Sequence, residues 1–168
     1  PDPLVFTYQW LANGEAIEGA TASTLTLGQA QVGKEISVAV SYRDDQGTEE
    51  SVTSAATTAV VNVNDEPTGS VTITGTARED ETLTAVSTLQ DEDGLGELSY
   101  QWLANGEAID GATASTLTLG QAQVGKAISV AVSYRDLQGT DESVTSEATT
   151  AVENVNDLPV DFTVTIAG

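Results

Sequence analysis

A stretch of 58 residues occurs twice in this chain, and this repetition limits what the chain can fold into. Residues 8–65 return as residues 100–157, a shift of 92, with the same residue at 52 of the 58 positions. A period near a hundred residues is too long for a solenoid unit and matches one small domain. We therefore expect each repeat to fold around its own core. The differing positions, expected to face water, are Glu18/Asp110, Glu35/Ala127, Asp45/Leu137, Glu49/Asp141, Ala55/Glu147 and Val61/Glu153.

The chain is strongly acidic and lacks several side chains that enzymes and soft metals need. It has 26 acidic and 5 basic residues, a net charge of −21, and no His, Cys or Met. Such a surface repels nucleic acid and anionic membranes and attracts divalent cations, although acidity can also serve solubility alone. Zinc-thiolate sites, thiol nucleophiles and the commonest general base are excluded. Any bound metal is expected to be hard and oxygen-liganded, calcium before magnesium.

Apolar and polar residues alternate along most of the chain, which is typical of half-buried strands. No long stretch has helical spacing, and Asn13-Gly14 and Asn105-Gly106 suit tight hairpin turns. We therefore predict an all-β chain of tandem immunoglobulin-like sandwiches. In the second repeat the expected strands are residues 69–75, 82–87, 98–103, 115–119, 128–135 and 142–152.

The two tryptophans admit two interpretations. In a sandwich, Trp102 lies on a central strand and packs inside, with Val130 where immunoglobulins have their second half-cystine. Apolar packing alone then holds the sheets together. The alternative is a sugar-stacking platform, because alternation places Trp102 on the same face as Tyr100.

The repeats divide the chain into three predicted segments. Residues 1–66 form a partial repeat without its first two strands, residues 67–158 form a complete repeat, and residues 159–168 begin another. Within the last segment, residues 160–166 resemble the first strand of a repeat. Either the chain is a piece of a longer polypeptide, or the terminal strand of one molecule completes the open sandwich of its neighbour.

Acidic residues cluster at the expected joints between repeats. In a sandwich, the segment at 62–66 meets the loops at 91–93 and 136, and the loop at 79–81 meets the segment at 154–157. Crowded carboxylates repel one another unless a cation lies among them, and calcium takes six to eight oxygens. The predicted calcium ligands are Asn62, Asn64, Asp65, Glu66, Asp91, Asp93 and Asp136 at one joint, and Glu79, Glu81, Asn156 and Asp157 at the other.

These residues also carry a resemblance. Asn62-Val63-Asn64-Asp65-Glu66-Pro67 is similar to the cadherin linker Asp-x-Asn-Asp-Asn, and Asp91-Glu92-Asp93 to the cadherin Asp-x-Asp. The whole repeat resembles the cadherin-like or immunoglobulin-like repeats of giant bacterial surface adhesins. The resemblance implies calcium at the interdomain joints, type I secretion, an extracellular position on the bacterial surface, and a role in attachment or biofilm.

The favoured function is a non-catalytic extender, a string of repeats that holds a binding domain away from the cell. Its expected partners are neighbouring repeats, without nucleic acid or membrane insertion, because no apolar run approaches the roughly 20 residues that span a bilayer. The first alternative is a subunit of an extracellular filament or sheath assembled by strand exchange. A carbohydrate-binding module is a further alternative, and a hydrolase is least favoured because Asp91 and Asp93 have no basic or nucleophilic partner.

Overall fold

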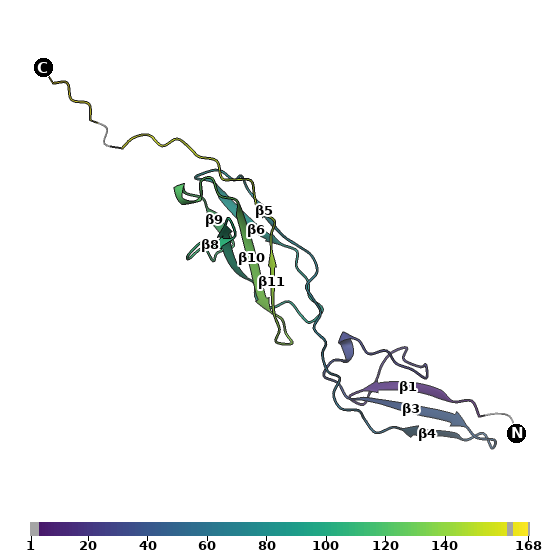
Figure 1. Ribbon diagram of the computed structural model, residues 1–168. Helices are drawn as coiled ribbons and strands as arrows, with labels where there is room; N and C mark the ends of the chain where they lie inside the picture. The colour runs from purple at the N-terminus through teal and green to yellow at the C-terminus, as the bar shows by residue number, and fades with distance from the viewer. Residues whose placement is uncertain (1–3, 161–162, 168) are drawn as a thin grey trace. The chain divides into compact units, whose positions relative to one another are not determined.

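The computed structural model describes residues 4–160 and 163–167, and the chain divides into two compact units between Asn64 and Asp65 (Figure 1). Described residues form strands, turns and two short 3-10 helices, so the all-β prediction is confirmed. The strand expected at residues 160–166 includes Asp161 and Phe162, which lie outside the described residues. The rest of that stretch, residues 163–166, forms no strand.

The second unit contains two antiparallel sheets. One has the order β11-β10-β7-β8, and the other has the order β5-β6-β9 (Figure 1). The first sheet consists of β11 (Asp141–Thr145), β10 (Ile128–Arg135), β7 (Ser99–Ala104) and β8 (Glu107–Ala108). The second consists of β5 (Val71–Thr74), β6 (Thr82–Ser87) and β9 (Thr116–Thr118), and the 3-10 helix η2 (Gln121–Gln123) follows β9.

The apolar core of the second unit takes side chains from both sheets. Leu83 of β6 and Trp102, Ile128, Val130 and Val132 of the other sheet are fully buried. Trp102 lies opposite Val130 in the β7–β10 ladder, and its indole Nε1 donates to the carbonyl of Ala114 at 2.8 Å. Because no surface of Trp102 is exposed, the sugar-stacking interpretation is wrong for this residue.

The first unit has one described sheet, with the order β2-β1-β3-β4. Its strands are β2 (Glu15–Ala16), β1 (Thr7–Ala12), β3 (Ile36–Arg43) and β4 (Glu49–Thr53), with the 3-10 helix η1 (Gln29–Gln31) between β2 and β3. These elements correspond to β8, β7, β10, β11 and η2 of the second unit. Residues 24–26, which correspond to β9, form no strand. The described part of this unit therefore has one face without a second sheet.

Most strand boundaries follow the alternation, with one clear exception. Strands β6 and β10 have the expected limits, and the Asn105-Gly106 turn has positive φ angles of 49° and 81°. The strand expected at 142–152 instead ends at Thr145. Beyond it, the hydroxyls of Ser146 and Thr149 accept the amides of Val130 and Ile128, while their own amides donate to the carbonyls of the same residues, so side chains take over half of each pairing.

The positions that differ between the repeats are on the surface, as expected. All twelve residues of the six differing pairs are exposed except Ala127, which is half-buried. The core residues that lie within residues 100–157 are therefore the same in both repeats.

Leucines at matching positions provide a test of this core. Leu119 is 1% exposed and Leu27 is 49% exposed, within the same local sequence. We expect Leu119→Ala to lower the free energy of unfolding of the second unit by about 2–5 kcal/mol. The matched change Leu27→Ala should lower that of the first unit by less than about 1 kcal/mol.

Urea unfolding checks both values. Trp102 fluorescence in a Trp10→Phe background reports on the second unit, and Trp10 fluorescence in a Trp102→Phe background reports on the first. Equal losses for the two alanine variants would contradict the difference in packing.

Candidate metal site

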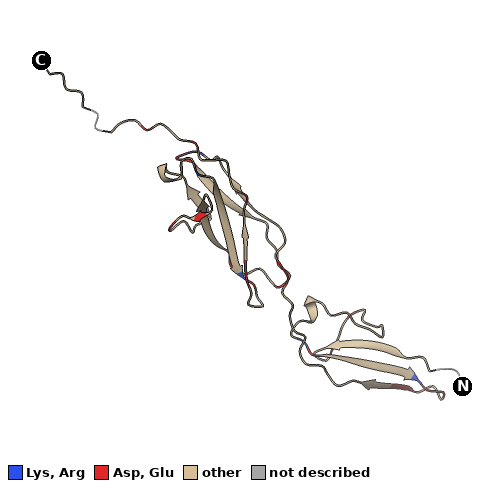
Figure 2. Ribbon diagram, in the orientation of Figure 1, with Lys and Arg blue, Asp and Glu red and all other residues tan. Residues whose placement is uncertain are grey.

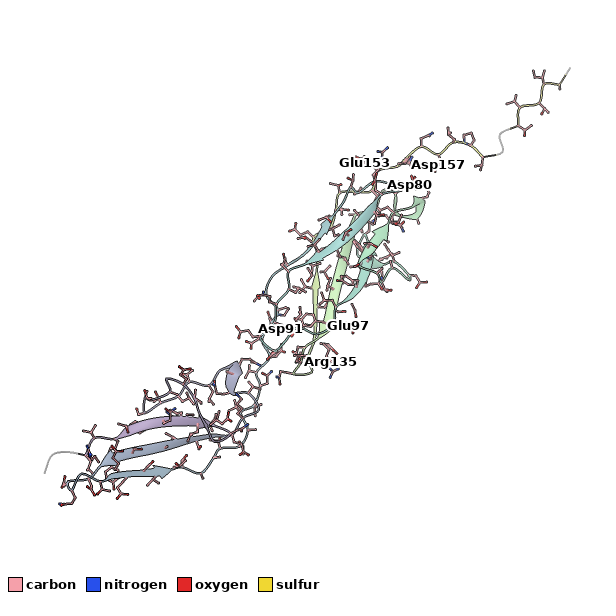
Figure 3. The ribbon with its side chains drawn as sticks, turned by 180° about the vertical axis from the view of Figure 1, so that it is seen from behind. Asp80, Asp91, Glu97, Arg135, Glu153 and Asp157 are labelled. Atoms are coloured by element: carbon pink, nitrogen blue, oxygen red, sulfur yellow. The ribbon has the colours of Figure 1, made fainter. Side chains whose placement is uncertain are left out.

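Acidic side chains lie at both ends of the second unit, where its loops are (Figure 2). Figure 3 shows Asp91 with Glu97 and Arg135 at one end, and Asp80, Glu153 and Asp157 at the other. The two ends differ in how closely they bring carboxylates together. The end that contains Asp91 is described first.

Asp136 is held by the turn that follows β10. Its Oδ1 accepts the backbone amides of Gln138 and Thr140, both at 2.8 Å, and the residue is only 4% exposed. Burial alone would raise the pKa of Asp136, but these hydrogen bonds to its charged form hold the pKa below its ordinary value. The turn therefore presents an ionised carboxylate whose Oδ2 is still free to bind.

The loop before β7 supplies two more carboxylates. Asp91 Oδ1 accepts the amide of Asp93 at 2.8 Å, which fixes the two side chains relative to each other. Asp91 Oδ2 accepts the hydroxyl of Tyr134 at 2.6 Å. The pKa of Tyr134 is raised, first by burial and then by this hydrogen bond to Asp91, so the phenol stays a donor.

Asp93 joins this loop to the start of the unit. It is 2% exposed, and its Oδ2 accepts the backbone amide of Asp65 at 2.6 Å. Asp65 and Glu66 line an open hollow of about 530 Å³ together with Asp91 and Glu92. The first residues of the second unit are thus bound to the acidic loop by a backbone contact.

Three buried side-chain oxygens have no hydrogen-bond partner among the described residues. They are Asn62 Oδ1, Asp93 Oδ1 and Asp136 Oδ2, and all three belong to residues that the sequence predicts as ligands. A buried carboxylate oxygen without a partner is unfavourable, because it has lost its water without a replacement. The two aspartate oxygens lie within the second unit and are available for a cation.

A further acidic side chain, Glu142, lies close to Asp91 and Asp136. Carboxylate oxygens of Asp91, Asp136 and Glu142 lie within 4.8 Å of one another. Carboxylates this close repel one another unless a positive charge lies between them. Within the described ranges, this is the one group of three or more such side chains with that spacing.

Of the ligands predicted from the sequence for this end, the structure brings Asp91 and Asp136 together, and they are joined by Glu142, which the sequence reasoning missed. The side chain of Asp93 accepts the backbone amide of Asp65, and its own amide donates to the side chain of Asp91, while Glu66 lines the hollow beside Asp91. Glu142 is on β11, opposite Tyr134 in the β10–β11 ladder. That strand pairing was the available signal, because the residue opposite Tyr134 lies near the carboxylate that Tyr134 binds. Asn62 and Asn64 belong to the first unit, where the side-chain oxygen of Asn62 is buried.

At the other end of the second unit the predicted ligands lie less close together. Glu79 is 4% exposed, and its Oε2 accepts the amide of Val155 at 2.9 Å, while its own amide donates to the carbonyl of Glu153. Glu81, Asn156 and Asp157 are exposed. Glu79 therefore meets the segment expected from the sequence, but these four predicted ligands do not form a compact carboxylate group.

The donor set at the first end fits a hard cation. Asp91, Asp136 and Glu142 offer carboxylate oxygens within 4.8 Å of one another, with no sulfur or nitrogen ligand among them. Asp93, whose backbone amide donates to Asp91, adds a buried oxygen without a partner. Two of these oxygens are buried and lack another partner. Calcium accepts six to eight oxygens with flexible geometry, so backbone carbonyls and water are able to complete such a shell.

Comparisons with known proteins add no relative. A scan against family models finds no match to this chain, and a search of curated proteins also finds none. None of the helices in the described parts of the chain has the length and apolar character needed to cross a membrane.

The hydrogen bond between Tyr134 and Asp91 can be tested by removing one hydroxyl. Tyr134→Phe should lower the free energy of unfolding of the second unit, without added metal, by about 1.5–3 kcal/mol, as for other hydrogen bonds to charged groups. Tyr42→Phe is the matched control, because the given sequence has no counterpart of Asp91 for the first unit. Urea unfolding in chelator measures both variants, and equal losses would show that the bond contributes nothing specific.

Proposed function

We propose that this chain is part of a non-catalytic extender of a secreted bacterial surface adhesin. Its repeats are immunoglobulin-like sandwiches that bind calcium, and the chain acts outside the cell. Two sheets around one core, and Trp102 opposite Val130 on central strands, support the sandwich class. Near-identical repeats favour a function that depends on the number of copies, such as the length of an extended chain, over a function that needs one catalytic site.

The observation that carries the proposal is the pair of buried, unpartnered oxygens on Asp93 and Asp136. A protein that needed acidity only for solubility would place it on exposed residues, where each carboxylate keeps its water. Here Asp136, 4% exposed, lies within reach of Asp91 and Glu142, and Asp93, 2% exposed, donates its backbone amide to Asp91. A bound calcium ion would offset the repulsion among Asp91, Asp136 and Glu142 and supply a partner to a buried oxygen.

The ion would also act on the first residue of the second unit. Asp93 binds the amide of Asp65 through one oxygen and leaves the other without a partner. Binding of calcium to the free oxygen would immobilise Asp93 and, through it, the backbone at Asp65. We infer that calcium stiffens an extender at these residues, which is the use expected of a repeat that holds a binding domain at a distance.

Calcium is favoured over magnesium by the kind of site. Magnesium requires near-octahedral geometry with short bonds and keeps several waters, whereas calcium tolerates many protein oxygens at irregular positions. The loops around Asp93 and Asp136 are fixed by their own backbone hydrogen bonds, which restricts their adjustment to a smaller ion.

A filament subunit is the second candidate. The described part of the first unit has a sheet with one face uncovered, and Val164 and Ile166 near the end of the chain are 71% and 94% exposed. Strand exchange between molecules would cover such surfaces. It would give polymers whose length depends on protein concentration.

Calcium binding is tested most sharply by one substitution made at two matching positions. Asp136→Asn removes a charge from the acidic group, and Asp44→Asn makes the same change in the corresponding turn of the first unit. Asp44 Oδ1 accepts the amides of Gln46 and Thr48 at 2.9 and 2.8 Å, so both substitutions disturb the same kind of turn. We expect Asp136→Asn to weaken calcium binding about tenfold or more and Asp44→Asn to leave it unchanged.

Titration calorimetry on chelator-treated protein measures the affinity, with magnesium as the comparison ion. Calcium should also stabilise the second unit against heat, by about 2.7 kcal/mol when free calcium is a hundredfold above Kd. The proposal would be contradicted if calorimetry of the parent chain showed no heat of calcium binding. It would also be contradicted if Asp136→Asn and Asp44→Asn weakened calcium binding equally.

A further inference from the structure

Five residues of identical sequence have different backbone structures in the two units. Residues 115–119 of the second unit contain β9, which pairs with β6 with Leu117 opposite Leu83. Residues 23–27 of the first unit have the same sequence and form no strand. Because the local sequence is the same, the difference comes from the neighbouring chain. No described strand of the first unit stands in the place of β6.

An open apolar groove lies on this face of the first unit. Its volume is about 450 Å³, no charged side chain lines it, and its large apolar residues are Trp10, Leu25, Leu27, Ile36, Val60 and Val61. The counterparts of the first five in the second unit belong to the core or pack against it; they are Trp102, Leu117, Leu119, Ile128 and Val152. The counterpart of Val61 is Glu153, which is exposed. Apart from Val61, the groove is therefore the same surface that forms the core in the second unit, without its cover.

The second unit shows what covers this surface. Leu83 of β6 lies within the core and is 0% exposed. Beside it, Ala85 donates its amide to the carbonyl of Ser115, and Glu81 accepts the amide of Leu119. Strand β5 then pairs with the outer edge of β6 and buries Val71. Ser23 and Leu27 carry the corresponding backbone groups in the first unit.

We propose that the groove of the first unit is a docking site for a β-hairpin of the type that β5 and β6 form. The inner strand of this hairpin pairs antiparallel with residues 24–26, and a leucine at the position of Leu83 enters the groove. Docking converts residues 24–26 into a strand and buries Leu27. This assignment concerns the first unit, whereas the acidic group belongs to the second, so it stands independently of the calcium proposal.

The groove also sets the chemistry of its partner. Its lining offers no opposite charge, so a charged side chain entering at the position of Leu83 would lose its water without a counter-charge. A hairpin fits better than a single strand, because β5 covers the outer edge of β6 and adds Val71 to the core. The partner is thus a two-stranded segment with small or apolar residues on one face.

The test uses the complete chain with two forms of the same probe. The first is a synthetic peptide with the sequence of residues 68–90, added in excess. The second is a fusion of residues 68–92 directly ahead of Pro1. In this fusion the hairpin is as far along the chain from the groove residues as it is in the second repeat, and the entropic cost of association is reduced. Hydrogen exchange at residues 23–27 is read by mass spectrometry, and the Glu18/Asp110 difference distinguishes peptic fragments of the two repeats.

We expect the fusion to slow exchange at residues 23–27 about tenfold or more, and the peptide to do so at saturation. The same peptide and fusion with Leu83→Asp should give no slowing. Unchanged exchange in the fusion, or equal slowing by the Leu83→Asp forms, would overturn the proposal. It would also be overturned if these amides are protected in the chain alone and deletion of residues 159–168 removes that protection, because the tail of a second copy would then occupy the groove.

Discussion

The second unit depends on apolar packing between its two sheets. Leu83 from one sheet meets Trp102 and Ile128 from the other, and no cysteine is present to link the sheets covalently. Burying one such side chain stabilises a fold by about 1.5–3 kcal/mol, so a few of them decide whether the sheets remain together. The same packing reaches the acidic end, because Tyr134 lies in the core and its hydroxyl binds Asp91.

The acidic loops oppose this packing. Their aspartates are held close by local backbone hydrogen bonds, and two of their oxygens are buried without partners. Close carboxylates repel one another, and a buried carboxylate oxygen without a partner is unfavourable. A cation among them would offset both effects. The unit therefore combines an apolar core with an acidic end that a bound cation would stabilise, as the proposed function requires.

The sequence predicted those parts in which local pattern and final environment agree. Alternation located β6 and β10 to the residue, and the spacing of acidic residues identified Asp91, Asp93 and Asp136. The alternation did not predict that β11 ends at Thr145, beyond which side-chain hydroxyls accept amides of the neighbouring strand. Glu142 was missed because its place in the group depends on strand register. The different states of residues 23–27 and 115–119 could not be predicted locally, since their sequences are the same.

The order of the elements along the chain has a consequence for synthesis. The hairpin of β5 and β6 leaves the ribosome after the whole first unit and before β7, β9 and β10, which it covers in the second unit. During that interval the open groove of the first unit offers the hairpin a similar apolar surface on the same chain. Repeats of such similar sequence are thus able to exchange their hairpins during folding. Rapid translation through residues 99–135 would favour correct pairing, whereas a pause there would favour exchange between repeats.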